Sequence, residues 1–253
     1  MLGRHHLMIS LATVSVVLMP FLDNHGALAL TVFLGTAVGS LIPDSDSKDA
    51  AIFHSNVKGL NGDIGSLVNN LFAPVFPVFG YATKYAIYKP AVIIYDKTFS
   101  NYSFQEKHRS FSHSILGVLT MTAVTGLYIT PLLIYLNILS IPYLTAFLTA
   151  YMAGAFMHML EDSCTKTGIS WNAPFSSTKL KGKLTTSSKP EHVKKPRYLL
   201  YTLGILSPVS LIMSTSQQFR FTDLELAGIG FLASVTVWLV FMIFVAGVRF
   251  QKN

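Results

Sequence analysis

Seven side chains that can bind a metal ion stand at the ends of apolar segments in this chain: His6, Asp44, Asp46, His108, His113, His158 and Asp162. Histidine and aspartate are costly near hydrocarbon unless they are paired, hydrogen-bonded or coordinated. Such a group therefore predicts a functional site, provided that the fold brings its members together. Because Cys164 is the single cysteine, any metal here is held by nitrogen and oxygen. Zinc is then the leading metal and manganese the second choice.

His158 and Asp162 form the most specific local pattern, since they stand four residues apart near the end of an apolar segment. Residues at this spacing lie on one helix face, so that an imidazole and a carboxylate can bind one ion together. A hydrogen-bonded pair without an ion is the alternative, and it is the commoner case for such a pair alone. Glu161, between them, is a candidate general base acting through a water.

Residues 107–114, KHRSFSHS, place His108 and His113 at the entry to another apolar segment, with Ser112 as a candidate helix cap. If the two histidines stood five residues apart on one continuous helix, their rings would point in different directions. A loop-to-helix transition is therefore needed to bring both to a shared site, and two unrelated interfacial histidines are the alternative. Arg109 has a planar guanidinium that matches a phosphate, which makes it a candidate anion clamp.

Residues 39–46, GSLIPDSD, end the second apolar segment with two carboxylates in a turn that Pro43 initiates. In an extended turn Asp44 and Asp46 would face opposite ways. Each then addresses a different ion, or one orients a histidine from behind, and Asp46 is also a candidate general base. An ordinary turn or helix start is the alternative. His6 completes the set at the start of the first apolar segment, beside His5.

The elements that must position these residues are membrane-spanning helices. Of the 253 residues, 51% are hydrophobic and 12% charged, whereas about 25% are charged in ordinary soluble domains. The apolar stretches are 7–22, 27–43, 113–136, 138–160, 198–213 and 227–248, several of them near the ~20 residues that cross a bilayer as helix. The sequence therefore predicts an all-α fold, a multi-span transmembrane helical bundle of about six spans.

Two alternatives to a membrane bundle were weighed. A large soluble helical protein would suit the short first segment, which Pro20 and Asp23 interrupt. A secretory signal would suit Arg4 followed by residues 7–19. However, no clear small-residue cleavage site follows before the next apolar run, so we expect a mature helix there.

Counting the spans places all seven candidate ligands on one side of the membrane. If the six segments cross in turn, the N-terminus, residues 44–112, residues 161–197 and the C-terminus share that side. Of the 19 Lys and Arg residues, only Arg220 falls on the other side. Because the side richer in Lys and Arg is cytoplasmic, we expect a multi-pass cell-membrane protein with both termini and the metal site at the cytoplasmic end. The basic cluster at 179–197 also suits anionic lipid or an anionic substrate.

One stretch complicates this count. Residues 68–95 are apolar and aromatic but contain Lys84, Lys89 and three prolines. We interpret them as interfacial or re-entrant, because lysines and prolines suit the headgroup zone better than the bilayer core. The polar stretch 47–66 is expected to be a surface loop.

The motifs occur in the order His6, PDxD at 43–46, HRxFSHS at 108–114, HxxxDxxTxxG at 158–168 and WxxPF at 171–175. This order, within residues 3–180, resembles the YdjM-like membrane-bound metal-dependent hydrolases and favours His6 over His5. The resemblance implies one membrane-embedded hydrolase domain over 1–253, with additional helices in 198–249. The family is distantly similar to the zinc phospholipase C and single-strand nuclease superfamily, which implies one to three zinc ions bound by His and Asp.

The chain departs from the family pattern in two places. Ser47 stands where many relatives carry a further histidine, so one contact at the site is absent or replaced. An insertion of roughly residues 48–100 separates the PDxD and HRxFSHS motifs, and it either covers the site or adapts substrate access. Neither departure removes one of the seven candidate ligands.

The expected activity is hydrolysis of an anionic phosphoester at the membrane, because a bound zinc ion lowers the pKa of its water to about 7 and polarises a phosphoryl oxygen. Phospholipid and nucleotide-type substrates both remain open, and nucleic acid is the less favoured partner. A membrane metal-binding or transport protein is the non-enzyme alternative, although a transporter would place ligands at mid-span, often within internal repeats. A structural zinc site without turnover is the third.

Overall fold

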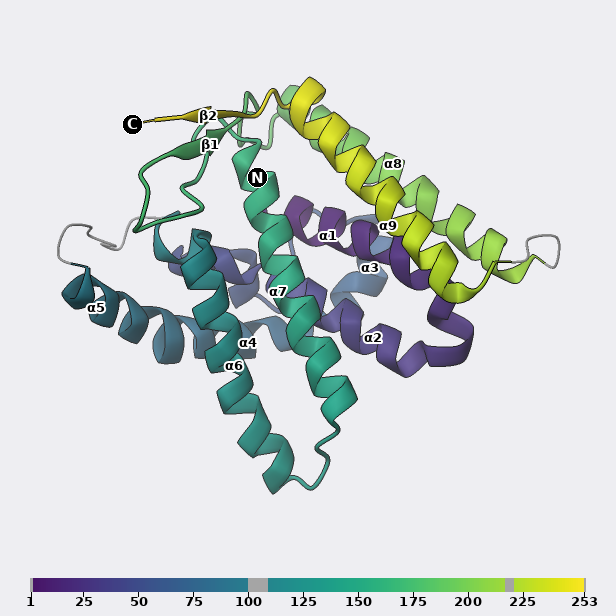
Figure 1. The fold of residues 1–253 in the computed structure, drawn as a ribbon, viewed down its shortest axis with the longest axis horizontal. Helices are drawn as coiled ribbons and strands as arrows, with labels where there is room; N and C mark the ends of the chain where they lie inside the picture. The colour runs from purple at the N-terminus through teal and green to yellow at the C-terminus, as the bar shows by residue number, and fades with distance from the viewer. Residues whose placement is uncertain (1, 100–108, 217–220, 253) are drawn as a thin grey trace.

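The computed structural model describes residues 2–99, 109–216 and 221–252, and within them it confirms the all-α fold (Figure 1). The α-helices are α1 Gly3–Leu18, α2 Leu22–Gly39, α3 Gly62–Leu71, α4 Phe76–Ala82, α5 Lys89–Thr98, α6 Ile115–Tyr135, α7 Ile141–Ser163, α8 Pro190–Thr215 and α9 Asp223–Val240. Short 3-10 helices are η1 Met19–Phe21, η2 Ile42–Asp46, η3 Ala51–Phe53, η4 Ala73–Val75 and η6 Phe111–His113. Two π-helical segments are η5 Thr83–Tyr88 and η7 Phe241–Val245.

Among the described residues, six helical runs are long and apolar enough to cross a membrane: Gly3–Asp46, Gly62–Thr98, Ile115–Tyr135, Ile141–Ser163, Pro190–Thr215 and Asp223–Val245. The expected number of spans is therefore confirmed, but the assignment differs. The first two expected segments belong to a single run, because η1 joins α1 to α2 without a polar loop. The run Gly62–Thr98, which was expected to be interfacial or re-entrant, completes the six by its length and composition.

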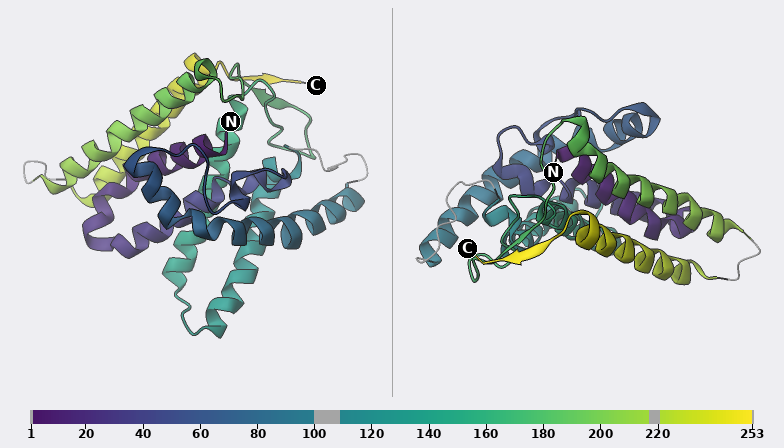
Figure 2. Two further views of the ribbon diagram at one scale, coloured as in Figure 1. Left: turned by 180° about the vertical axis from the view of Figure 1, so that it is seen from behind. Right: turned by 90° about the horizontal axis from the view of Figure 1, so that it is seen from above.

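Three antiparallel hairpins make up most of the bundle: α1 with α2, α6 with α7, and α8 with α9 (Figures 1 and 2). Pro20, in η1, ends α1 and lets α2 return beside it. The hairpin tips point away from a common end, where α1 begins, η2 and η6 lie, and α7 ends. We call this the open end of the bundle. The span count places the two ends of each hairpin on the same side of the membrane, in agreement with the observed hairpins. Which side of the membrane the open end faces stays a prediction.

Residues 62–98 form an almost continuous helical path through α3, η4, α4, η5 and α5. In Figure 1 and in the left view of Figure 2, α4 and α5 run across α6 rather than alongside it. The expected loop 47–66 is shorter than predicted, because α3 already begins at Gly62 and η3 interrupts the loop. The interfacial or re-entrant position of this path stays a prediction.

The basic residues of 179–197 do not share one loop, contrary to the sequence interpretation. Strand β1 Lys179–Lys181 pairs antiparallel with β2 Arg249–Gln251, with Leu180 opposite Phe250. Helix α8 begins at Pro190, a favoured residue for a first helical turn. Lys194, Lys195 and Arg197 therefore lie on a helix, and Lys179 and Lys181 lie on a strand that pairs with the C-terminal segment.

Helices α2 and α7 form the most extensive helix pair of the fold. Gly35 and Gly39, four residues apart on α2, face α7 without a side chain between the backbones. A Cβ atom on Gly39 would collide with the carbonyl of Tyr151, and one on Gly154 would lie 2.5 Å from the Thr36 carbonyl oxygen. Small residues at this spacing let membrane helices approach closely. The close approach fixes the end of α2 against the last turns of α7.

We predict that Gly39→Ala destabilises the protein by about 2 kcal/mol or more, because the added methyl group must push two helix backbones apart. Gly26→Ala is the matched control on the same helix, since a Cβ atom there meets nothing within 4 Å. The measurement is thermal unfolding in detergent. Equal melting temperatures for the two variants would show that the close approach of α2 and α7 does not limit stability.

Candidate metal centre

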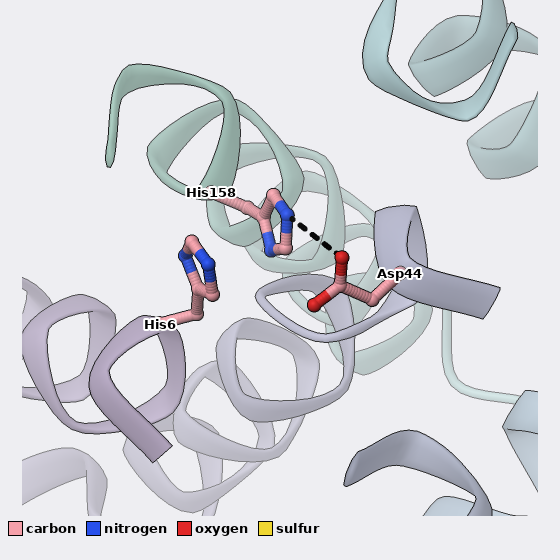
Figure 3. Close-up of side chains that lie close together, drawn as sticks. All are labelled: His6, Asp44 and His158. Carbon is pink, nitrogen blue, oxygen red and sulfur yellow. Dashed lines mark ion pairs between the residues drawn. The ribbon is translucent and has the colours of Figure 1, made fainter. Parts of the chain in front are cut away.

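Six of the seven expected ligands converge at the open end of the bundle. His6 comes from α1, Asp44 and Asp46 from η2, His113 from η6, and His158 and Asp162 from the end of α7. Figure 3 shows three of them, with the rings of His6 and His158 and the carboxylate of Asp44 gathered between their helices. His108 lies outside the described residues. The three described histidines and Asp162 are fully buried, while 16% of the Asp44 side chain is exposed.

His158 and His113 stand at the centre of this cluster. Their Nε2 atoms are 3.2 Å apart, and Asp162 Oδ2 lies 3.5 Å from His113 Nε2 and 3.7 Å from His158 Nε2. Asp44 Oδ1 lies 3.6 Å from both nitrogens. Ligand atoms around a tetrahedral ion with bonds of about 2.0–2.2 Å stand ~3.3–3.6 Å apart. The donor separations thus match those of a metal coordination sphere.

Hydrogen bonds behind both rings turn their lone pairs toward each other. His158 Nδ1 lies 2.7 Å from the carbonyl oxygen of Ser40, which can only accept, so Nδ1 donates and Nε2 carries the lone pair. Ser112 Oγ donates to Asp46 Oδ2 at 3.1 Å and therefore accepts from His113 Nδ1 at 3.0 Å. Two lone pairs that face each other at 3.2 Å need a cation or a proton near them.

The His113 ring, which lies just before α6, has a strong affinity for positive charge. Burial lowers its pKa, but hydrogen bonds to Asp162 and Asp44 and the charge of Asp46 outweigh burial and raise the pKa to about 9. Without a metal ion the ring holds a proton at neutral pH. A metal ion that binds here must displace that proton.

His6 extends the cluster on the other side of His158. The two rings stack with centroids 3.7 Å apart and planes at 16°. His6 Nδ1 lies 3.0 Å from Glu161 Oε2, and His6 Nε2 lies 3.6 Å from Asp162 Oδ1. Neither ring nitrogen, and neither carboxylate oxygen of Glu161, makes a well-aligned hydrogen bond within the described residues. His6, Asp44 and His158 therefore form a second donor group, which shares His158 with the group of His113 and Asp162.

Negative charge dominates the cluster. Four carboxylates converge there, from Asp44, Asp46, Glu161 and Asp162, and among the described side chains Arg109 supplies the one guanidinium or ammonium group in contact with them. Buried carboxylates are costly without counter-charge. Within the described residues, the cluster therefore offers more acidic than basic groups, an arrangement that suits protons or a cation.

Arg109 is held in place by three bonds. Its Nη2 donates to Asp162 Oδ1 at 2.7 Å, its Nη1 to Thr165 Oγ1 at 3.0 Å, and its backbone N–H to Asp46 Oδ2 at 3.0 Å. The residue adopts φ 69°, a left-handed conformation that costs roughly 1–2 kcal/mol in a residue with a side chain. Its Nε is buried without a hydrogen-bond partner in the described structure. The guanidinium is thus anchored to the cluster through Nη1 and Nη2, and its Nε donor is unused.

The structure changes the expected roles of several residues. η2 is a 3-10 helix, so the expectation of an extended turn at Asp44 and Asp46 is wrong, and both carboxylates face His113 from opposite sides of its ring. Ser112 is not the helix cap, because Ser114 Oγ accepts from Gly117 N–H at the start of α6. No sequence pattern indicated a role for the Ser40 carbonyl. Thr165 stood within the HxxxDxxTxxG motif but had no assigned role.

Comparison with curated proteins and with solved structures finds no match. The sequence model of one family, described as YdjM inner membrane protein, matches residues 1–250. That match includes every residue of the cluster and all three hairpins. The chain therefore belongs to the YdjM inner membrane protein family and is a multi-pass membrane protein.

Proposed function

We propose that this protein is a membrane-bound, metal-dependent hydrolase that cleaves a phosphoester at the His/Asp cluster. One observation carries the proposal: the buried Nε2 atoms of His113 and His158 face each other at 3.2 Å, with oxygens of Asp44 and Asp162 at 3.5–3.7 Å from them. Nitrogen and oxygen donors at these separations suit zinc first and manganese second. Two donor groups that share His158 suit one to three ions.

The chain's own residues would divide the work in a specific way. His113, His158 and Asp162 would hold one ion, and Asp44 and His6 would extend the site. A bound divalent ion lowers the pKa of its water to about 7 and polarises a phosphoryl oxygen. Asp44, the most exposed of the four carboxylates, marks the side from which a substrate would enter.

Asp46 and Glu161 fit orienting roles better than the role of general base. Asp46 accepts from Ser112, which in turn holds His113, and Glu161 lies against His6 Nδ1 with no exposed surface. Carboxylates behind metal-binding histidines fix the ring orientation and raise its basicity. Arg109 is the proposed phosphate ligand, through the Nε donor that its anchoring bonds leave unused.

The open end of the bundle is proposed to face the cytoplasm. Of the 19 Lys and Arg residues in the sequence, Arg220 alone falls in the short sequence stretches that connect the two helices of a hairpin. The other Lys and Arg residues that the structure describes belong to the open end or to the path that leads across it. Because Lys and Arg are retained in the cytoplasm during insertion, the termini and the cluster would lie there.

We predict that His158→Ala removes most of the bound metal and abolishes hydrolysis of a generic phosphodiester, because His158 belongs to both donor groups. Lys183→Ala, outside the cluster, is the control and should keep both properties. The measurements are elemental analysis of detergent-purified protein and release of nitrophenol from bis(p-nitrophenyl) phosphate. Full metal occupancy in His158→Ala would refute the site, and metal without turnover in the wild type would favour a binding or transport role.

Glu161→Gln is predicted to weaken metal binding about 10–100-fold while the protein stays folded, because the amide keeps the shape but removes the carboxyl group that faces His6 Nδ1. Glu191→Gln, on the surface of α8, is the matched control. Competition with a fluorescent metal chelator measures the affinity. Identical affinities for Glu161→Gln and the wild type would exclude the orienting role.

A further inference from the structure

An apolar groove of about 440 Å³ runs along α1 between α7 and α9. In Figure 1 the front of the bundle shows α1 between these two helices. Thirteen residues line the groove, and the only polar groups among their side chains are the hydroxyls of Thr13 and Ser234 and the indole N–H of Trp238. Trp238 Nε1 donates to Thr13 Oγ1 at 3.1 Å, so two of these groups satisfy each other. We call this cavity the α1 groove.

The α1 groove leads to the His/Asp cluster. On α7 its lining residues Met157 and Leu160 bracket His158 and directly precede Glu161. On α1 its first lining residue, Thr13, stands seven residues after His6, or about 10 Å along the helix axis. Between them, Ser10 is fully buried and its hydroxyl has no hydrogen-bond partner within the described residues. The groove therefore continues the cluster along the same two helices, toward the middle of the membrane runs.

The α1 groove opens to the outside of the bundle on the α9 side. Phe231, Val235 and Leu239 line it, and their side chains remain 57%, 37% and 53% exposed. They belong to the run Asp223–Val245, the most apolar of the six membrane runs. At this depth the surrounding medium is lipid hydrocarbon, which is the one abundant material that matches an uncharged, apolar wall.

We propose that the α1 groove binds a hydrocarbon chain of the substrate, and that the substrate is a membrane phospholipid whose phosphoester lies at the His/Asp cluster. This inference rests on the proposed hydrolase function and names its substrate class. A phospholipid places its phosphate at the membrane interface and its acyl chains toward the bilayer centre. The cluster and the groove are arranged in the same order along α1 and α7. Nucleotides have no long apolar chain for such a groove.

A second apolar cavity provides a matched control. It has a similar volume, about 460 Å³, and lies among α2, α4, α6 and α7 near the tip of the α6–α7 hairpin. Its last lining residue on α7, Phe147, precedes His158 by eleven residues, or about 16 Å along the helix. Lipid chains that fill this cavity do not reach the cluster, so blocking it tests for general effects of a bulky residue in a membrane-facing cavity.

The test compares Val235→Trp, which fills the α1 groove, with Leu144→Trp, which fills the control cavity. Each variant is reconstituted in vesicles of phosphatidylethanolamine and phosphatidylglycerol that contain a phospholipid with a photoactivatable diazirine in its acyl chain. Crosslinked peptides are identified by mass spectrometry. Hydrolysis of the vesicle phospholipid and of soluble bis(p-nitrophenyl) phosphate is measured in parallel. Val14→Trp, which fills the same groove from α1, serves if Val235→Trp does not fold.

We expect the wild type and Leu144→Trp to crosslink within α1 and α9 and to hydrolyse phospholipid. Val235→Trp should lose these crosslinks and at least tenfold of its phospholipid turnover, while its metal content and soluble-substrate turnover stay unchanged. Equal phospholipid turnover in both variants, or groove crosslinks that persist in Val235→Trp, would overturn the inference. If the wild type hydrolyses neither substrate, the proposed function fails, and the crosslinks still decide whether the groove holds an acyl chain.

Discussion

The close approach of α2 and α7 is the constraint on which the candidate site depends. Gly35, Gly39 and Gly154 let the two backbones meet without intervening side chains. The first residue after α2, Ser40, then brings its carbonyl oxygen to 2.7 Å from His158 Nδ1. That single bond fixes the tautomer of the most central histidine. The turn η2 follows immediately, so the same contact delivers Asp44 and Asp46 to the end of α7.

The cost of burying charged and polar groups explains why so many hydrogen bonds surround the few side chains that could bind a metal. Four carboxylates and three histidines share a mostly buried space, although each would be better solvated in water. Ser112 and the backbone N–H of Arg109 oppose this by holding Asp46 and the His113 ring, and Thr165 holds the Arg109 guanidinium that binds Asp162. Arg109 accepts a left-handed backbone because its bonds to Asp162, Thr165 and Asp46 together outweigh the strain. The positions of the donors are therefore set before any ion arrives.

Much of this architecture follows from the sequence. Apolar length predicts the spans of the later hairpins, and the spacing of His158 and Asp162 correctly predicts that both face the same group of donors, because helix periodicity is local. The order of spans also predicts that the seven candidate ligands share one end of the bundle, and the six that the structure describes do so. These inferences need only the chain's own hydrophobicity and the geometry of a single helix.

Other features depend on contacts between distant segments, and the types of single residues do not predict them. Pro43 favours a turn, but only packing against α7 makes that turn a 3-10 helix that aims both aspartates at His113. Ser112 and Ser114 are equally good helix caps by residue type. Ser112 donates to Asp46 instead, and Ser114 caps the helix. The first two apolar segments form one helical run that folds back at Pro20, because η1 has no polar residue to separate them. The pairing of Glu161 with His6 joins the two ends of a stretch of over 150 residues.

The hairpin arrangement also has a consequence for how the protein is made. His6 and the aspartates of η2 are synthesised well before Asp162, so the cluster cannot form until α7 has been inserted. With the open end in the cytoplasm, as proposed above, none of the cluster's carboxylates has to be carried through hydrocarbon, which would be costly for a charged group. Insertion then translocates the connections within the hairpins and leaves the cluster on the side where it is synthesised. The cluster assembles late, once the end of α7 meets η2 and the start of α1.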